Sequence, residues 1–226
     1  MHQPIKSYEL NLFTVLLGCK PQGRNVEQHD VLFGVANKLD DLSDTIKDFW
    51  YKPFIAEVYA AMKKMLPGLD AAVLKENLMK TLSRRDKVHI DAWMQVEYVD
   101  GYKVSISRKA DNNGESKMKL YFINLGGYKE NEFEEYHKKL FVVASTVSEA
   151  LEKVMSLDFM KDYSPASLGI AGSAHLDDQY KIDFEADDIV CVSEAIDRDY
   201  AILLEKTDVV AGNKMTVGYT QINYPE

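Results

Sequence analysis

The chain has 226 residues, of which 46% are hydrophobic and 28% charged, and its formal net charge is −9. This is enough apolar material for one large domain or two small ones. The negative charge argues against a nucleic-acid partner, whose phosphates it would repel, and no apolar run is long enough to span a bilayer. Two cysteines, Cys19 and Cys191, are too few for a disulfide framework and are expected to be free thiols of a reducing compartment.

The first apolar segment, Leu10–Leu17, is hydrophobic on both faces, which is typical of a buried central strand. With the following Gly18-Cys19 it resembles a lipoprotein signal, but the run is short and the same element recurs in mid-chain, so a strand is the better interpretation. Gly18 is expected to be a turn glycine. A turn follows at 21–25, and then a second strand, Val31–Ala36.

The next part of the chain is predicted to be helical. Asp40-Asp41 opens a helix whose apolar residues recur at helical spacing. Pro53 suits the first turn of a second helix, and Asp70 can cap a third.

A half-buried strand is predicted at Val88–Tyr98, because its residues alternate with period two. Val88, Ile90, Ala92, Met94 and Val96 should face one way, and His89, Asp91, Trp93, Gln95 and Glu97 the other. Asp100-Gly101 is a typical two-residue hairpin turn before a returning strand that begins at Tyr102.

The most informative feature is a second copy of the first strand pair. Leu12–Ala36 matches Leu120–Ala144 without a gap, at an offset of 108 residues. A capping box, Thr146 to Glu149, opens the helix of the second copy. The counterpart of the His89 strand is expected to start at His175, at an offset of 86. The first copy is thus 22 residues longer, about the length of its extra helical material.

These elements predict an α+β fold of two tandem β-β-α-β-β repeats with approximate two-fold symmetry. The first repeat is expected at 9–108, with a helical insertion at 53–82, and the second at 118–226, with a strand extension at 200–224. The sequence leaves open whether the repeats form one continuous sheet or two.

Short motifs recur in order along the chain: His-Asp-Val-Leu-Phe at 29–33, His-Ile-Asp-Ala-Trp at 89–93, Val-Asp-Gly-Tyr at 99–102, Asn-Leu-Gly-Gly-Tyr at 124–128, Glu-Tyr-His-Lys at 135–138, Leu-Phe-Val-Val-Ala at 140–144 and His-Leu-Asp-Asp at 175–178. Together these motifs resemble the bacterial "domain of unknown function 1543" family. The resemblance implies a small, soluble bacterial protein of the cytoplasm. It carries no established activity, so no catalytic residue can be transferred from it.

Four of the five histidines form pairs between the expected repeats, and each has a carboxylate two residues away. The candidate polar clusters are Glu27, His29, His89 and Asp91 in the first repeat and Glu135, His137, His175 and Asp177 in the second. Residues i and i+2 of a strand share a face, so each cluster could hold a divalent metal through its histidines or support acid–base chemistry. The favoured interpretation is nevertheless structural, with each imidazole donating to a backbone carbonyl as a latch and the neighbouring carboxylate holding its tautomer.

Two classes of function remain. The favoured one is a non-enzymatic binding or assembly module, with a homo-oligomer as a candidate assembly. The alternative is a small metal-assisted or acid–base enzyme that uses a His/carboxylate cluster. No HExxH, CxxC or glycine-rich phosphate loop accompanies the histidines, so no cofactor is predicted beyond a divalent metal. The ligand or substrate and the oligomeric state are left open.

Overall fold

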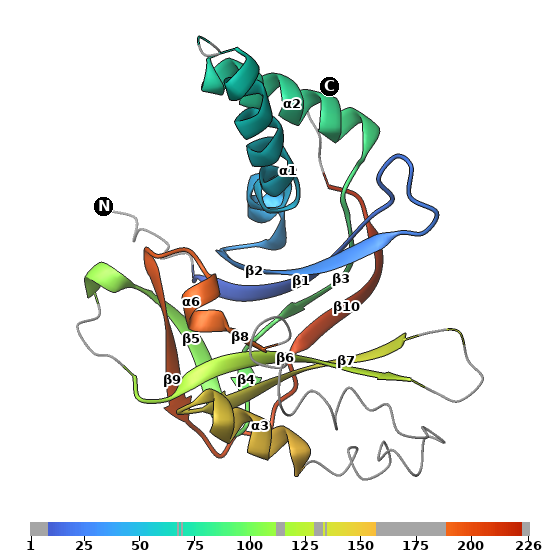
Figure 1. Ribbon diagram of the computed structural model, residues 1–226. Coiled ribbons are helices and arrows are strands. Elements are labelled where there is room, and N and C mark those ends of the chain that lie inside the picture. Colours follow the sequence, from blue (N-terminus) through green and yellow to red (C-terminus); the bar gives the residue numbers. More distant parts are fainter. Residues whose placement is uncertain are drawn as a thin grey trace. The chain divides into compact units, whose positions relative to one another are not determined.

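The computed structural model describes residues 9–66, 68, 70–111, 116–128, 133, 135–156 and 189–222. The side chains of 126–128, 135, 136 and 155 are outside this description. The chain divides into two compact units, residues 1–97 with 212–226 and residues 98–211 (Figure 1). Both units combine helices with antiparallel sheets, so the predicted α+β class is confirmed.

The first unit contains a four-stranded antiparallel sheet in the order β10-β3-β1-β2. These strands are β1 (Asn11–Cys19), β2 (Gln28–Ala36), β3 (His89–Gln95) and β10 (Lys214–Thr220). β1 pairs with both β2 and β3, which confirms the buried central strand predicted from its two apolar faces.

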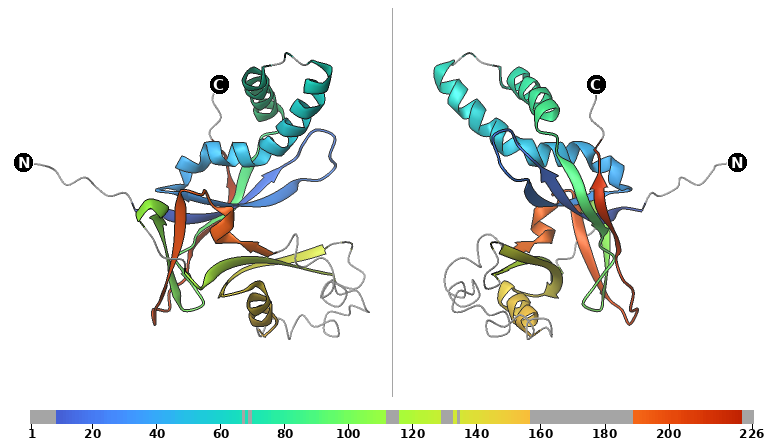
Figure 2. Two further views of the ribbon diagram at one scale, coloured as in Figure 1. Left: turned by 60° about the vertical axis from the view of Figure 1, so that its left-hand side comes forward. Right: turned by 90° about the vertical axis from the view of Figure 1, so that its right-hand side faces the viewer.

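One face of this sheet is covered by helices, which follow a 3-10 turn, η1 (Leu39–Leu42) (Figure 1). α1 (Ser43–Met65) and α2 (Ala71–Arg85) pack against alternate residues of β1, among them Val15 and Leu17, both fully buried. The core ends near the middle of α1: after Ile55 most residues of both helices are exposed, and the helices reach beyond the sheet (Figure 2).

The prediction of a helix break at Pro53 is wrong. α1 is one helix with Pro53 inside it, although proline removes one backbone N–H from the helical ladder. Tyr51 and Ile55 lie on either side of Pro53 and are buried in the same core, so packing holds the helix continuous. The predicted cap of α2 is confirmed, because Asp70 Oδ1 accepts a hydrogen bond from the backbone N–H of Ala72 at 2.8 Å.

The second unit has two three-stranded sheets. The first, in the order β7-β6-β8, contains β6 (Lys119–Tyr128), β7 (Glu135–Ala144) and β8 (Ile189–Cys191), and α3 (Val147–Met155) packs against it. The second, in the order β4-β5-β9, contains β4 (Tyr98–Val99), β5 (Tyr102–Arg108) and β9 (Tyr200–Lys206). Among the described residues this unit also contains two short helices, η2 (Lys109–Asp111) and α6 (Val192–Ala195).

Local turn and cap predictions are confirmed in this unit. Asp100 and Gly101 both have positive φ, as a two-residue hairpin requires, and join β4 to β5. Thr146 Oγ1 accepts a hydrogen bond from the N–H of Glu149 at 3.1 Å and so caps α3. The carboxylate of Glu149 in turn accepts from the backbone N–H and the hydroxyl of Ser145.

The duplication of the first strand pair is confirmed in the backbone register. β1 and β2 pair from Asn11 opposite Ala36 through Gly18 opposite His29. β6 and β7 pair in the same way, with Gly126 opposite His137, so each partner is displaced by the expected 108 residues.

The rest of the expected layout is not reproduced in the described residues. β5 pairs with β9 and β10 pairs with β3, so strands from the two expected repeats, 9–108 and 118–226, are exchanged between the compact units. Cross-strand apolar pairs such as Ile106 opposite Ile202 provide a physical reason for the first exchange. The full β-β-α-β-β repeat remains a prediction.

The place of β3 is taken in the second unit by β8. Cys191 lies opposite Tyr121 of β6, as Gln95 lies opposite Phe13 of β1, which gives an offset of 96 rather than 86. The segment from His175, predicted to fill this place, lies outside the described residues. None of the described helices is long and apolar enough to cross a membrane.

Candidate functional site

Polar side chains from β2 and β3 meet over the central strand β1 at Gly18. His29 of β2 and His89 of β3 are both register partners of Gly18. A Cβ atom at Gly18 would lie 2.8 Å from His89 Nε2 and would overlap Asp91 Oδ2 more severely. Gly18 is therefore not the turn residue predicted from sequence: it lies inside β1 and leaves the space in which the flanking side chains meet.

A β-bulge places Asp91 in this space. Leu17 pairs with Ile90 and Leu16 with Ala92, so Asp91 is an extra residue in β3. The bulge breaks the strict alternation predicted for this strand: Trp93 packs against the helix-covered core with Ile90 instead of sharing a face with His89. The predicted neighbourhood of His89 and Asp91 is nevertheless present, and their side chains lie 3.2 Å apart.

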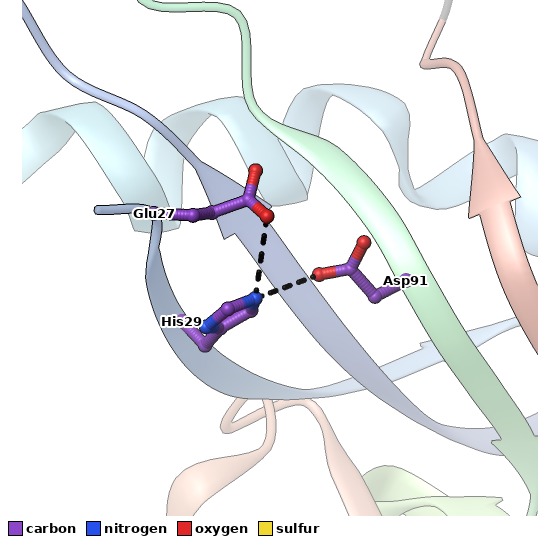
Figure 3. A group of neighbouring side chains, drawn as sticks. All are labelled: Glu27, His29 and Asp91. Atoms are coloured by element: carbon purple, nitrogen blue, oxygen red, sulfur yellow. Dashed lines mark ion pairs between the residues drawn. The ribbon is translucent and has the colours of Figure 1, made fainter. Parts of the chain in front are cut away.

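The two histidines each contact both carboxylates of the cluster. His29 Nε2 lies 3.5 Å from Glu27 Oε2 and 3.3 Å from Asp91 Oδ2 (Figure 3). His89 Nε2 lies 3.1 Å from Glu27 Oε1 and 3.2 Å from Asp91 Oδ1. Each carboxylate thus presents one oxygen to His29 and the other to His89. The predicted convergence of the Glu-x-His and His-x-Asp segments is present in the first unit.

The cluster is buried on the β3 side and open on the β2 side. The side chain of His89 is 13% exposed and that of Asp91 25%, whereas Glu27 and His29 are 38% and 48% exposed. Asp91 Oδ2 is itself buried and has no hydrogen-bond partner among the described residues. Within the described residues, neither imidazole donates to a backbone carbonyl, so the expected structural latch is not found there.

His89 is also in contact with the edge strand β10. Its ring lies 4.6 Å from the ring of Tyr219, centroid to centroid, at an interplanar angle of 39°. Tyr219 is 68% exposed. Sequence reasoning did not identify this neighbour, because the pairing of β10 with β3 joins residues more than 100 positions apart.

The second expected cluster is only partly within the described residues. His137 is exposed and lies opposite Gly126, in the register that His29 has with Gly18. Glu135 begins β7, and His175 and Asp177 lie outside the described residues. His29 lies within β2, which begins at Gln28 rather than at the predicted Val31, and His137 lies within β7. The second cluster remains a prediction.

Both cysteines are free, as predicted, and neither is primed as a nucleophile. Burial, followed by the negative charges of Asp86 and Glu27, raises the pKa of Cys19 to about 11. Burial likewise raises the pKa of Cys191. Both groups are therefore thiols at neutral pH.

Taken together, the chain is an α+β protein with a histidine–carboxylate cluster on the sheet of its first unit. The model of the family Domain of Unknown Function (DUF1543) matches residues 24–56 and 74–106, which confirms the resemblance at the motifs 29–33, 89–93 and 99–102; the motifs between 124 and 178 lie outside the matched segments. The matched segments include Glu27 and His29 in one and His89 and Asp91 in the other. The unmatched stretch between them, residues 57–73, belongs to the helical segment 53–82 that was predicted to be an insertion.

A similar fold occurs in a solved structure, the crystal structure of the protein Il1583 from Idiomarina loihiensis. It is 19% identical to this chain, with a TM-score of 0.52, and the match covers 96% of this chain and 100% of that one. The likeness concerns the fold alone. No curated protein matches the chain.

Proposed function

We propose that this protein binds a divalent metal ion through Glu27, His29 and Asp91. One ligand atom from each of these residues can be chosen so that all three lie within 4.8 Å of one another. Ligands held about 2.0–2.1 Å from a tetrahedral ion are about 3.3–3.4 Å apart. The separations from His29 Nε2 to the two carboxylate oxygens, 3.5 and 3.3 Å, are close to this value.

The observation that carries the proposal is that Asp91 Oδ2 is buried without a hydrogen bond. This oxygen is buried and close to His29 Nε2, yet the pair does not have hydrogen-bond geometry. An unpaired buried carboxylate oxygen is costly. A cation shared by Asp91, Glu27 and His29 would remove that cost, because both oxygens and the imidazole nitrogen would point at the ion instead of at one another.

The donor set narrows the identity of the ion. One imidazole and two carboxylates suit first-row divalent ions such as Zn²⁺, Co²⁺ and Mn²⁺ better than Cu⁺, which prefers sulfur ligands. Binding such an ion agrees with the class of non-enzymatic binding module favoured from the sequence.

The open side of the cluster supports a second candidate, a metal-assisted enzyme. Three protein ligands leave coordination positions for water or substrate, as in catalytic zinc sites. His29 and Glu27, at 48% and 38% exposure, form the open side. Such an enzyme would be the metal-assisted alternative predicted from sequence, with the ion supplying Lewis acidity and the chain supplying its position.

Metal uptake by the full chain tests the proposal. After dialysis against Zn²⁺ or Co²⁺ and removal of free ion, the wild-type protein should retain a stoichiometric ion in the first unit, measured by elemental analysis and calorimetry. His29→Ala and Asp91→Asn should lose it. Asp30→Asn is the matched control, because Asp30 is an exposed carboxylate next to His29 in β2 that is outside the cluster.

The comparison requires variants that are folded to the same extent as the wild type, and circular dichroism and urea unfolding test this. Retention of metal by His29→Ala and Asp91→Asn at the wild-type level would contradict the proposed site. Absence of uptake by the wild-type chain would contradict metal binding altogether.

A further inference from the structure

We infer that His89 is a positioning residue that fixes both carboxylates of the metal site without binding the ion itself. This inference rests on the proposed function. It is drawn from which oxygen each histidine contacts, from the burial of His89 and from its contact with Tyr219.

The two histidines use different oxygens of the same carboxylates. His29 Nε2 is nearest Glu27 Oε2 and Asp91 Oδ2, the oxygens that would face the ion. His89 Nε2 is nearest the other two, Glu27 Oε1 at 3.1 Å and Asp91 Oδ1 at 3.2 Å. If the ion lies between His29 Nε2 and the oxygens Glu27 Oε2 and Asp91 Oδ2, His89 stays on the other side of the two carboxylates. There it contacts Glu27 Oε1 and Asp91 Oδ1, the oxygens turned away from the ion.

These are ion-pair contacts rather than hydrogen bonds, and at 3.1 and 3.2 Å the Nε2–H of His89 is in reach of an outer oxygen of each ligand, to which it can donate once an ion holds the inner oxygens. A donor on the outer oxygen of a ligating carboxylate fixes its rotation and directs the inner oxygen at the metal. Glu27 precedes β2 and is 38% exposed, so the local backbone constrains it little. The contact with His89 ties it to Asp91, which the bulge of β3 holds in place.

His89 has the surroundings that a positioning residue needs. Its side chain is 13% exposed, and the ring of Tyr219 packs against it at 4.6 Å. The ring cannot swing out without losing this contact. β10, near the end of the chain, thus supports a site whose ligands come from β3 and the β2 segment.

Three variants test the inference on the full-length chain. His89→Ala should lower the affinity for Zn²⁺ or Co²⁺ about 10–100-fold without lowering the number of ions bound at the site. His89→Gln, which keeps an N–H donor, should recover most of that loss. Tyr219→Ala removes only the packing ring from an exposed position, so it should fold normally and weaken binding less than His89→Ala.

A spectroscopic measurement separates positioning from ligation. With Cu²⁺ as the probe, pulsed electron paramagnetic resonance counts the imidazoles bound to the ion of this site. We expect one in the wild type and one in His89→Ala. His29→Ala, which should lose the ion, should give no imidazole-coupled Cu²⁺ signal from this site and is the background reference.

The outcomes distinguish this inference from the proposed function. Two bound imidazoles in the wild type and one in His89→Ala would make His89 a ligand and overturn the inference while leaving the metal site intact. Wild-type affinity in both His89→Ala and Tyr219→Ala would overturn it as well. A wild-type chain that binds no metal overturns the proposed function and the inference together.

Discussion

Replacing Gly18 with alanine should weaken metal binding strongly while leaving the fold in place. Gly18 is not among the glycines with positive φ, so its backbone accepts an alanine without strain. The new Cβ would lie 2.8 Å from His89 Nε2, about 0.6 Å inside ordinary van der Waals contact at 3.4 Å. Its overlap with Asp91 Oδ2 is more severe. The substitution therefore acts directly on the space where the cluster forms.

The size of the effect follows from that overlap. A preorganised site tolerates displacements of about 0.5 Å, and both side chains must move further than this. We expect the metal affinity to fall at least about 100-fold, because a ligand and its support are displaced together. The atoms in the way are the ends of side chains, which can rotate outward, so the free energy of unfolding should fall by only about 1 kcal/mol, the low end of overpacking costs.

Co²⁺ titration followed by visible absorption measures the affinity of the Gly18→Ala chain, and urea unfolding measures its stability. Gly212→Ala is the matched control, since a Cβ there would meet nothing within 4 Å. Wild-type Co²⁺ affinity in a folded Gly18→Ala chain would refute the role given to this glycine. A metal affinity lost equally in Gly212→Ala would show that the effect is not local.

Two further predictions concern the first unit. Tyr51 is buried, and its hydroxyl donates to the backbone oxygen of Asp86 at 2.7 Å and accepts from the N–H of Val88 at 3.1 Å. Tyr51→Phe should therefore lower the free energy of unfolding by about 1–3 kcal/mol in urea, whereas Tyr59→Phe, half-buried on the same helix, should change it by less than about 0.5 kcal/mol. Burial opposes the ionisation of Asp86, but hydrogen bonds from Arg85 and the N–H of Gln22 outweigh it and hold the pKa of Asp86 below its usual value. The stability from this carboxylate is present above the unfolded pKa of about 3.9 and is lost as the pH falls through the lower folded pKa. Asp86→Asn should thus lower the free energy of unfolding by about 1–3 kcal/mol at pH 7, and the difference from wild type should shrink below about pH 4. A difference that is the same at every pH would show that the ionised carboxylate is not its cause.

The sequence alone determined the local structure of this protein. β1 is apolar on both faces, and that pattern was sufficient to place it at the centre of a sheet. The caps at Asp70 and Thr146 and the turn at Asp100-Gly101 depend on a few adjacent residues, so the local sequence was sufficient to predict them. The ungapped offset of 108 residues fixed the register of two strand pairs, because register follows from which residues share a face.

Spacing along the chain also groups the residues of the candidate site into two pairs. Glu27 and His29 are two residues apart, as are His89 and Asp91, and the period of a strand puts such pairs on one face. That the two segments would meet does not follow from this spacing. Their meeting depends on β1 lying between β2 and β3 and on Gly18 carrying no side chain there.

Only the tertiary structure decided how strands far apart in the chain pair. β10 pairs with β3, and β9 pairs with β5. An edge strand pairs with the partner that completes its hydrogen bonds and packing, and the hydrophobic periodicity of the sequence does not indicate which partner that is. The same holds for the bulge at Asp91 and for α1, where burial of Tyr51 and Ile55 overrides the preference of Pro53 for a helix start. Local preferences are worth about 1 kcal/mol or less for most residues and about 3 kcal/mol for a proline inside a helix, so the summed contacts made across the fold decide wherever the two conflict.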